Sequence, residues 1–145
     1  MATNSINEII CSGGFILAVD TKRFLFLLRN NLKTSGQWGF VGGRKEPVDT
    51  TPFDTLTREI NEEIGLPKIK KTIPLELFVS NDSRFQYNTY VILVESEFIP
   101  VLNNEHSGYA WCQYGKWPRP LHNGVKHSLN NKITRAKIEL LLDLI

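Results

Sequence analysis

An acidic segment in the middle of the sequence carries the residue types of a divalent-cation site. Glu59, Glu62 and Glu63 are three or four positions apart, so that on a helix they share one side. Three carboxylates on one patch repel each other unless cations neutralise them, and hard oxygen ligands suit Mg²⁺ or Mn²⁺. Arg58 lies four positions before Glu62 and can hold that side chain by an ion pair. The pattern indicates a cation site, although the same residues also fit an ordinary solvated helix face.

The residues around these carboxylates predict a helix over residues 52–64. Thr51 is a good N-cap, Pro52 suits the first helical position, and Asp54 completes a capping-box pattern. Gly65 and Pro67 end the helix. Apolar residues recur at helical spacing and predict a buried stripe made of Phe53, Leu56, Ile60 and Ile64. The carboxylates should therefore project away from the core.

A glycine pair shortly before this helix strengthens the cation-site hypothesis. Gly42 and Gly43 allow a backbone turn that a Cβ atom would hinder. Such a turn can bring backbone carbonyl oxygens close to the same ions.

The remaining elements predict an α/β layered domain with a mixed sheet. Apolar, β-prone runs predict strands, first a hairpin and then further strands, at residues 9–19, 23–28, 38–41, 73–80, 87–95, 97–101 and 109–113. Residues 30–37, 81–86 and 116–125 are expected to be loops or irregular. A terminal helix is expected at about residues 131–145, with an apolar set of Ile133, Ala136, Ile138, Leu140, Leu141 and Leu144.

Composition fits one domain of ordinary size and excludes some classes of protein. The chain has 145 residues, 41% of them hydrophobic, and a net charge of only +2, so the total charge gives no strong bias toward nucleic acid or membrane. Cys11 and Cys112 share no metal-binding spacing and are expected to be reduced. No apolar run is long enough to span a bilayer, and residues 1–8 lack a secretory signal pattern. We expect an intracellular, cytoplasmic protein.

The segment Gly43–Leu66, GRKEPVDTTPFDTLTREINEEIGL, resembles the Nudix box. The second half, from Arg58 to Leu66, matches the family pattern Arg-Glu-apolar-x-Glu-Glu-x-Gly-apolar at every defined position. The first half departs from it, because Asp49 stands where the family usually has Glu and one extra residue lies between Asp49 and Arg58. Val41 also stands where Pro often precedes the glycines. The resemblance implies a Nudix-like α/β/α sandwich with a central mixed sheet, extending over residues 1–145 as a single domain.

The resemblance also implies a site and a reaction. Glu59, Glu62 and Glu63 would bind Mg²⁺ (with Mn²⁺ as a substitute), the Gly43 carbonyl would complete the shell, and Arg58 would support the catalytic carboxylates. Water would then attack a phosphorus atom of a diphosphate. Glu63 is one candidate for the general base in such a family.

A later segment, EHSGYAW from Glu105, offers a second candidate base. By resemblance, Glu105 would be a further metal ligand and His106 a general base, since His suits proton transfer near neutral pH. Both residues also fit an ordinary loop. The role of Asp49 stays open.

Candidate substrate contacts are less specific in the sequence. Arg29 and Arg44 flank the site and can hold phosphates, whereas Phe85 and Tyr87 can stack on a base. Each of these residues also fits a structural role at a strand end or in the core. The irregular segment with Trp117 and His122 either lines the pocket or covers the core.

The resemblance favours Mg²⁺-dependent hydrolysis of the pyrophosphate linkage in a nucleoside diphosphate derivative, such as a nucleotide sugar, an ADP-ribose-like compound, a dinucleotide polyphosphate or a nucleoside triphosphate. A first alternative is pyrophosphohydrolysis at an RNA 5′ end, against which the absence of a basic stripe argues. A second is a domain that binds a nucleotide without catalysis. The sequence leaves the substrate and a possible homodimer open.

Overall fold

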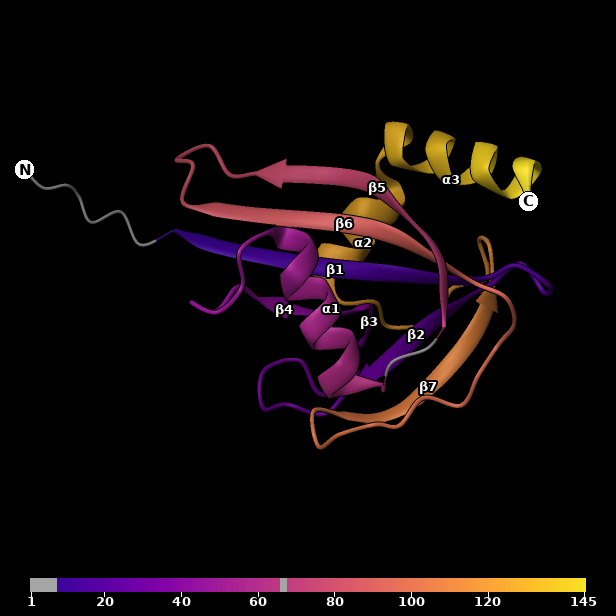
Figure 1. The fold of residues 1–145 in the computed structure, drawn as a ribbon, viewed down its shortest axis with the longest axis horizontal. Coiled ribbons are helices and arrows are strands. Elements are labelled where there is room, and N and C mark those ends of the chain that lie inside the picture. Colours follow the sequence, from indigo (N-terminus) through magenta and orange to yellow (C-terminus); the bar gives the residue numbers. More distant parts are fainter. Residues whose placement is uncertain (1–7, 66–67) are drawn as a thin grey trace, which may run out of the picture.

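The computed structural model describes residues 8–65 and 68–145, and within them seven strands form one sheet with three helices against it (Figure 1). In chain order the elements are β1 (Ile9–Ala18), β2 (Arg23–Arg29), β3 (Trp38–Gly39), β4 (Val41–Arg44), α1 (Pro52–Glu63), β5 (Ile69–Val79), β6 (Phe85–Val94), β7 (His106–Gln113), α2 (Asn123–Asn130) and α3 (Lys132–Leu144). Residues 1–7, Leu66 and Pro67, on which parts of the sequence predictions rest, lie outside the described residues.

The sheet is built around β1. Its strand order is β3-β2-β1-β6-β5, with β4 also paired to β1 and β7 also paired to β2. β1 and β6 run parallel from Ile9 opposite Phe85 to Ala18 opposite Val94, and the other pairings between named strands are antiparallel. The sheet is therefore mixed, as the sequence predicts.

Successive side chains of a strand point to opposite faces of the sheet, and this alternation builds two cores. One core packs α2 and α3 against one face, with Phe15, Leu17, Phe24, Phe26, Val125, Leu129 and Ile138 among its members. The other packs α1 against the opposite face, with Ile16, Ala18, Leu25, Leu27, Leu56, Ile60 and Ile64 among its members. In Figure 1, α1 lies in front of the sheet and α2 behind it, which confirms the α/β/α layering.

α1 begins at Pro52, as the sequence predicts, and ends at Glu63, one residue before the predicted end. The Thr51 hydroxyl accepts a hydrogen bond from the Asp54 amide, and the Asp54 carboxylate accepts one from the Thr51 amide, both at 3.1 Å. Gly65 follows the helix at a φ of +78°, a value that favours glycine. The predicted buried stripe holds for Leu56, Ile60 and Ile64, but Phe53 is 42% exposed, so its inclusion was wrong.

Two strand predictions are corrected by the backbone pairing. The predicted strand 38–41 is two short strands separated at Phe40, because β3 pairs with β2 whereas β4 pairs with β1. The predicted strand 97–101 is irregular. It instead covers the end of α1, where the Val101 amide donates to the Ile64 carbonyl at 3.0 Å and satisfies a carbonyl that the helix leaves free.

Other elements are longer than the sequence indicates. β5 begins at Ile69, β6 already includes Phe85 and Gln86, and β7 begins at His106, which was expected in a loop.

The C-terminal part holds a helix that the sequence reasoning missed. α2 begins inside the segment expected to be irregular, with the His122 side chain accepting from the Gly124 amide at its N-terminus. α3 matches the predicted terminal helix, but four of the six residues in the predicted apolar set are exposed, so this part of the prediction was wrong. Ile138 is fully buried, whereas the exposed members of that set are Ile133, Ala136, Leu140 and Leu144. None of the helices in residues 8–65 and 68–145 is long and apolar enough to cross a membrane.

Candidate active site

The carboxylates of α1 lie directly against the glycine strand β4. A Cβ atom built on Gly43 would lie 2.4 Å from Glu59 Oε1 and 2.5 Å from its Cδ, far inside ordinary contact. Glycine at this position therefore makes the space that the Glu59 carboxylate occupies. The close approach predicted for the glycine pair is present, and it brings the β4 backbone to the acidic side of α1.

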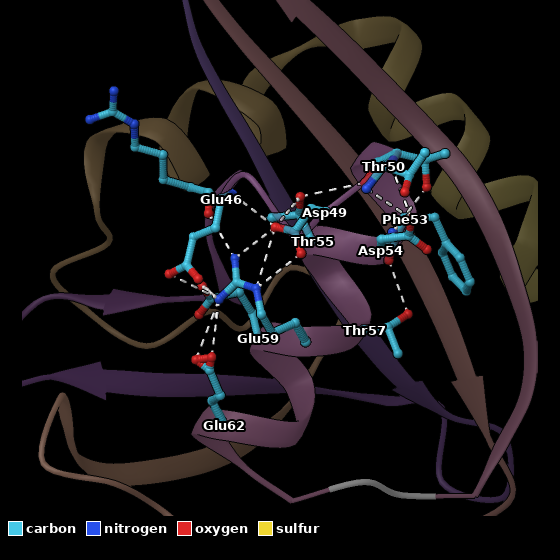
Figure 2. A network of polar contacts seen from close by, with 12 residues as sticks. Glu46, Asp49, Thr50, Phe53, Asp54, Thr55, Thr57, Glu59 and Glu62 are labelled. Atoms are coloured by element: carbon cyan, nitrogen blue, oxygen red, sulfur yellow. Dashed lines mark hydrogen bonds and ion pairs between the residues drawn. The ribbon is translucent and has the colours of Figure 1, made fainter.

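Arg58 is the hub of the polar contacts on this side of α1 (Figure 2). Its Nη1 lies 2.9 Å from Glu59 Oε1 and 3.0 Å from Glu62 Oε2, so the predicted Arg58–Glu62 pair is present. Its Nη2 donates to the Arg44 carbonyl at 2.9 Å, which ties the helix to the strand. One guanidinium thus sets the positions of two carboxylates and of the β4 backbone.

Asp49 holds that guanidinium in place. Its carboxylate accepts from Arg58 Nη2 at 2.9 Å, from the Thr55 hydroxyl at 3.0 Å and from the Glu46 amide at 2.9 Å. Only 5% of Asp49 is exposed, and its hydrogen bonds, above all with Arg58, hold its pKa well below the usual range. The extra residue before Arg58 therefore leaves the aspartate in contact with both the loop and the arginine.

Glu63 is the most buried of the helix carboxylates, with 3% exposed. Its Oε1 accepts from the Gly42 amide at 2.9 Å, and its Oε2 lies 3.3 Å from His106 Nδ1. Burial raises its pKa to about 8, and the nearby charges of Glu59 and Glu105 act in the same direction. Glu63 can therefore hold or accept a proton near neutral pH.

His106 lies beside Glu63 and is itself 7% exposed. Its Nδ1 has no aligned hydrogen-bond partner among the described residues, although it is close to the carboxylate. Burial lowers the pKa of His106, so the ring favours its neutral form. The structure thus places His106 against Glu63, at the start of β7.

Glu105 reaches the same region from the segment before β7. Asn103 positions it, because its side chain accepts from the Glu105 amide at 3.0 Å while its Nδ2 donates to the Glu62 carbonyl at 3.2 Å. The Glu105 charge contributes to a raised pKa at Glu59, where burial is the larger cause.

A cation fits the chemistry of these donors. Glu63 is buried and Glu59 is partly buried, both carboxylates have raised pKa values, and the space beside Gly43 brings a backbone carbonyl to them. No three acidic, histidine or cysteine side chains in the described parts of the chain are arranged as a finished metal cage. Two of these carboxylates, Glu59 and Glu62, are instead paired with the Arg58 guanidinium, at 2.9 and 3.0 Å.

A cavity of about 460 Å³ lies on the other side of the same glycines, between the sheet and α2. Four predicted substrate residues, Arg29, Arg44, Phe85 and Tyr87, line it together with Gly42 and Gly43. The size is in the usual range for small-molecule sites.

Two cross-strand rows form the floor of this cavity. In one row Gly42 pairs with Gly13, which pairs with Thr89, which pairs with Glu76. In the next row the partners are Arg44, Cys11, Tyr87 and Phe78. A Cβ on Gly13 would collide with the Tyr87 ring, so this glycine lets the ring lie across the floor.

The roof of the cavity contains residues that sequence reasoning did not assign. From α2 and its N-cap these are His122, Asn123, Gly124, Val125, His127 and Ser128, and two further unassigned residues, Glu76 and Phe78 of β5, lie at the ends of the floor rows. His122 lines the pocket, whereas Trp117 packs on the core with its ring 5.4 Å from that of Phe26. Period-two alternation along β5 would have placed Glu76 and Phe78 on one face. No comparable signal marks the short helix α2.

Comparisons with known proteins bear on the family and the fold of this chain. The model of the family described as NUDIX domain matches residues 12–131. A MutT NUDIX hydrolase from Burkholderia pseudomallei is 20% identical with a TM-score of 0.66, over 86% of this chain and 98% of that one. The NUDIX domain of Shewanella oneidensis NrtR, solved with ADP ribose, is 15% identical with a TM-score of 0.71, over 90% and 88%.

The Escherichia coli dihydroneopterin triphosphate pyrophosphohydrolase is 20% identical with a TM-score of 0.59, over 94% of this chain and 96% of that one. At such identities the structural likeness shows the fold alone. No curated protein matches the chain significantly in sequence.

Proposed function

The chain belongs to the NUDIX family, and on that premise we propose that it hydrolyses the pyrophosphate linkage of a nucleoside diphosphate derivative with the help of a divalent cation. The observation that carries the proposal is the position of β4. Gly42 and Gly43 have the buried carboxylates of α1 on one side and a 460 Å³ cavity on the other. A diphosphate at these glycines would meet both.

The cation site would consist of Glu59, Glu62 and Glu63, with the Gly43 carbonyl and Glu105 as further oxygen donors. Mg²⁺ suits such oxygens, and Mn²⁺ can substitute. When bound, the cation neutralises phosphate charge and makes the phosphorus more open to attack by water.

Glu63 is the residue that we assign as general base. The Gly42 amide fixes its Oε1, and its buried position beside the proposed cation site places a proton acceptor where the attacking water would be held. His106 has little exposed surface and its Nδ1 lies 3.3 Å from Glu63 Oε2, so we assign it to positioning Glu63 and not to direct contact with water. Arg58 orients Glu59 and Glu62 while Asp49 orients Arg58.

Substrate binding is assigned to the cavity. Arg29 and Arg44 supply guanidinium groups for the phosphates, and Phe85 and Tyr87 supply aromatic surface for a base. ADP ribose in the Shewanella oneidensis relative supports a nucleotide-type ligand for this chain.

The direct test is Mg²⁺-dependent product release from a panel of nucleoside triphosphates, nucleotide sugars, ADP-ribose-like compounds and dinucleotide polyphosphates. Glu63→Gln should lower kcat by roughly 10²- to 10⁴-fold, the usual range for a general base. Glu95→Gln is the matched control, because Glu95 is exposed and pairs only with Lys70 among the described residues. Unchanged turnover in both Glu63→Gln and Glu59→Gln would show that the active site has been assigned to the wrong residues.

The same assay separates the alternatives. Nucleotide binding without turnover at high Mg²⁺ would indicate a binding domain. Strong competition by 5′-triphosphorylated RNA against small nucleotides would indicate action at an RNA 5′ end.

A further inference from the structure

The cavity ends at β5 on a carboxylate, Glu76, that the hydrolytic centre does not use. Glu76 lies at the far end of the row that starts at Gly42 and passes through Gly13 and Thr89. Neighbouring strands are about 4.8 Å apart, so three steps separate the row ends by roughly 14 Å. A nucleotide that places its phosphates at the glycines therefore directs its heterocycle toward Glu76.

The surroundings of Glu76 distinguish this end of the cavity from the other. Arg44 lies at the β4 end, where phosphates would bind, whereas Glu76 is a lone carboxylate among the cavity-lining residues. Phe78 is two positions from Glu76 on the same face of β5, and its ring lies 5.8 Å from that of His127 and 6.1 Å from that of Phe85. These faces suit stacking with a flat heterocycle.

One oxygen of Glu76 is already engaged. The Ser128 hydroxyl, on α2, donates to Glu76 Oε1 at 2.6 Å and fixes the direction of the carboxylate. Within residues 8–65 and 68–145, no other side chain or amide donates to it and no cation pairs with it. An ionised carboxylate only accepts hydrogen bonds and has about four lone-pair sites, so Glu76 is left with acceptor capacity directed into a stacking pocket.

We propose that Glu76 selects a heterocycle with two adjacent N–H donors, the 2-amino-4-oxopyrimidine edge that guanine and pterins share. This edge offers a ring N–H beside an exocyclic amine, and both can donate to one carboxylate. Adenine presents an amine beside a ring acceptor, and uracil presents a ring N–H between two carbonyl groups, so each of them directs lone pairs at the carboxylate. The inference rests on the proposed function for the position of the phosphates.

Binding to the metal-free protein tests the inference without requiring turnover. Calorimetry would compare guanosine 5′-monophosphate with inosine 5′-monophosphate, which differs only by lacking the exocyclic amine, and would include neopterin monophosphate as the pterin probe. Guanosine or neopterin monophosphate should bind roughly ten- to a hundredfold more tightly than inosine monophosphate, the range for a hydrogen bond to a charged group. Whichever of these two probes binds more tightly shows whether the preferred ligand is a guanine nucleotide or a pterin.

Variants assign the selectivity to Glu76. Glu76→Gln should remove most of the difference in affinity between guanosine or neopterin monophosphate and inosine monophosphate. The glutamine side chain presents an N–H donor where the second N–H of the ligand needs an acceptor. Ser128→Ala should reduce this difference in affinity less, since it only frees the Glu76 carboxylate from its hydrogen bond. The control variant Glu95→Gln should leave the difference in affinity unchanged.

The inference is overturned if the wild-type protein does not prefer either probe over inosine monophosphate, or if Glu76→Gln keeps the full preference. Absence of hydrolysis with the preference intact would instead count against the proposed function.

Discussion

Replacing each glycine of the β4 pair by alanine should affect two different properties of the protein. At Gly43 the new Cβ meets only the end of a side chain, the Glu59 carboxylate, at 2.4 to 2.8 Å. At Gly42 it meets backbone, with the Ser12 carbonyl oxygen at 2.3 Å and the Gly13 Cα at 2.8 Å. A side-chain end can move, whereas two paired strands must separate to make room.

The magnitudes follow from these distances. Ordinary contact begins at 3.4 Å, so in Gly43→Ala the Glu59 carboxylate must retreat by about 1 Å, and a displacement of that size at a catalytic group can lower kcat/KM about 100-fold. In Gly42→Ala, forced separation of β1 from β4 should cost about 1–3 kcal/mol, as overpacking does. At roughly 2–4 °C per kcal/mol for a chain near this length, Tm should fall by roughly 2–12 °C.

The assay is thermal unfolding of both variants beside Mg²⁺-dependent turnover. Gly108→Ala is a suitable control, because its Cβ would contact the Leu28 side chain only at an ordinary 3.7 Å. Full activity in Gly43→Ala, or an equal loss of Tm in the two β4 variants, would refute this account of the site.

Three further predictions concern the supports of the site and of the fold. Asp49→Asn should release Arg58 and lower both the activity and Tm. Because the pKa of Asp49 is lower in the folded protein than in the unfolded chain, where it is about 3.9, the Tm difference between wild type and variant should be full above about pH 5 and should shrink as the pH falls below about 3.9. Scanning calorimetry across pH measures this difference. Ile138→Ala should cost about 2–5 kcal/mol in urea unfolding, whereas Leu140→Ala, at 61% exposed, should stay within about 0.5 kcal/mol. Thr51→Ala should cost about 1 kcal/mol by the same measurement, since it removes the helix cap.

The sequence was sufficient for α1 because the signals there are local. The cap at Thr51, the stop at Gly65 and the helical spacing of Leu56, Ile60 and Ile64 act within one element. The position of the carboxylates against the glycine pair was predicted from the backbone freedom of Gly42 and Gly43 and from the family resemblance. Asp49 was left open, since its contact with Arg58 depends on a loop path that a one-residue insertion makes ambiguous.

What the sequence did not give depends on contacts between distant segments. α2 has only eight residues, begins beside Pro120 and contains Gly124, so its local signal is weak, and it is held by packing of Val125 and Leu129 on the sheet. The exposed apolar residues of α3, such as Leu140, show that helical spacing alone does not choose which side of a helix meets the core. The cavity required both the register of four strands and this missed helix.

The parallel pairing of β1 with β6 has a consequence for how the chain is made. β1 ends at Ala18 but cannot complete its pairing until β6, ending at Val94, has been synthesised. At about 5–20 residues per second, a ribosome takes roughly 4–15 s to cover that interval. During that time the central strand, with Phe15, Ile16 and Leu17 in its second half, lacks its longest partner, so we expect this segment to be the part of the nascent chain that chaperones engage first.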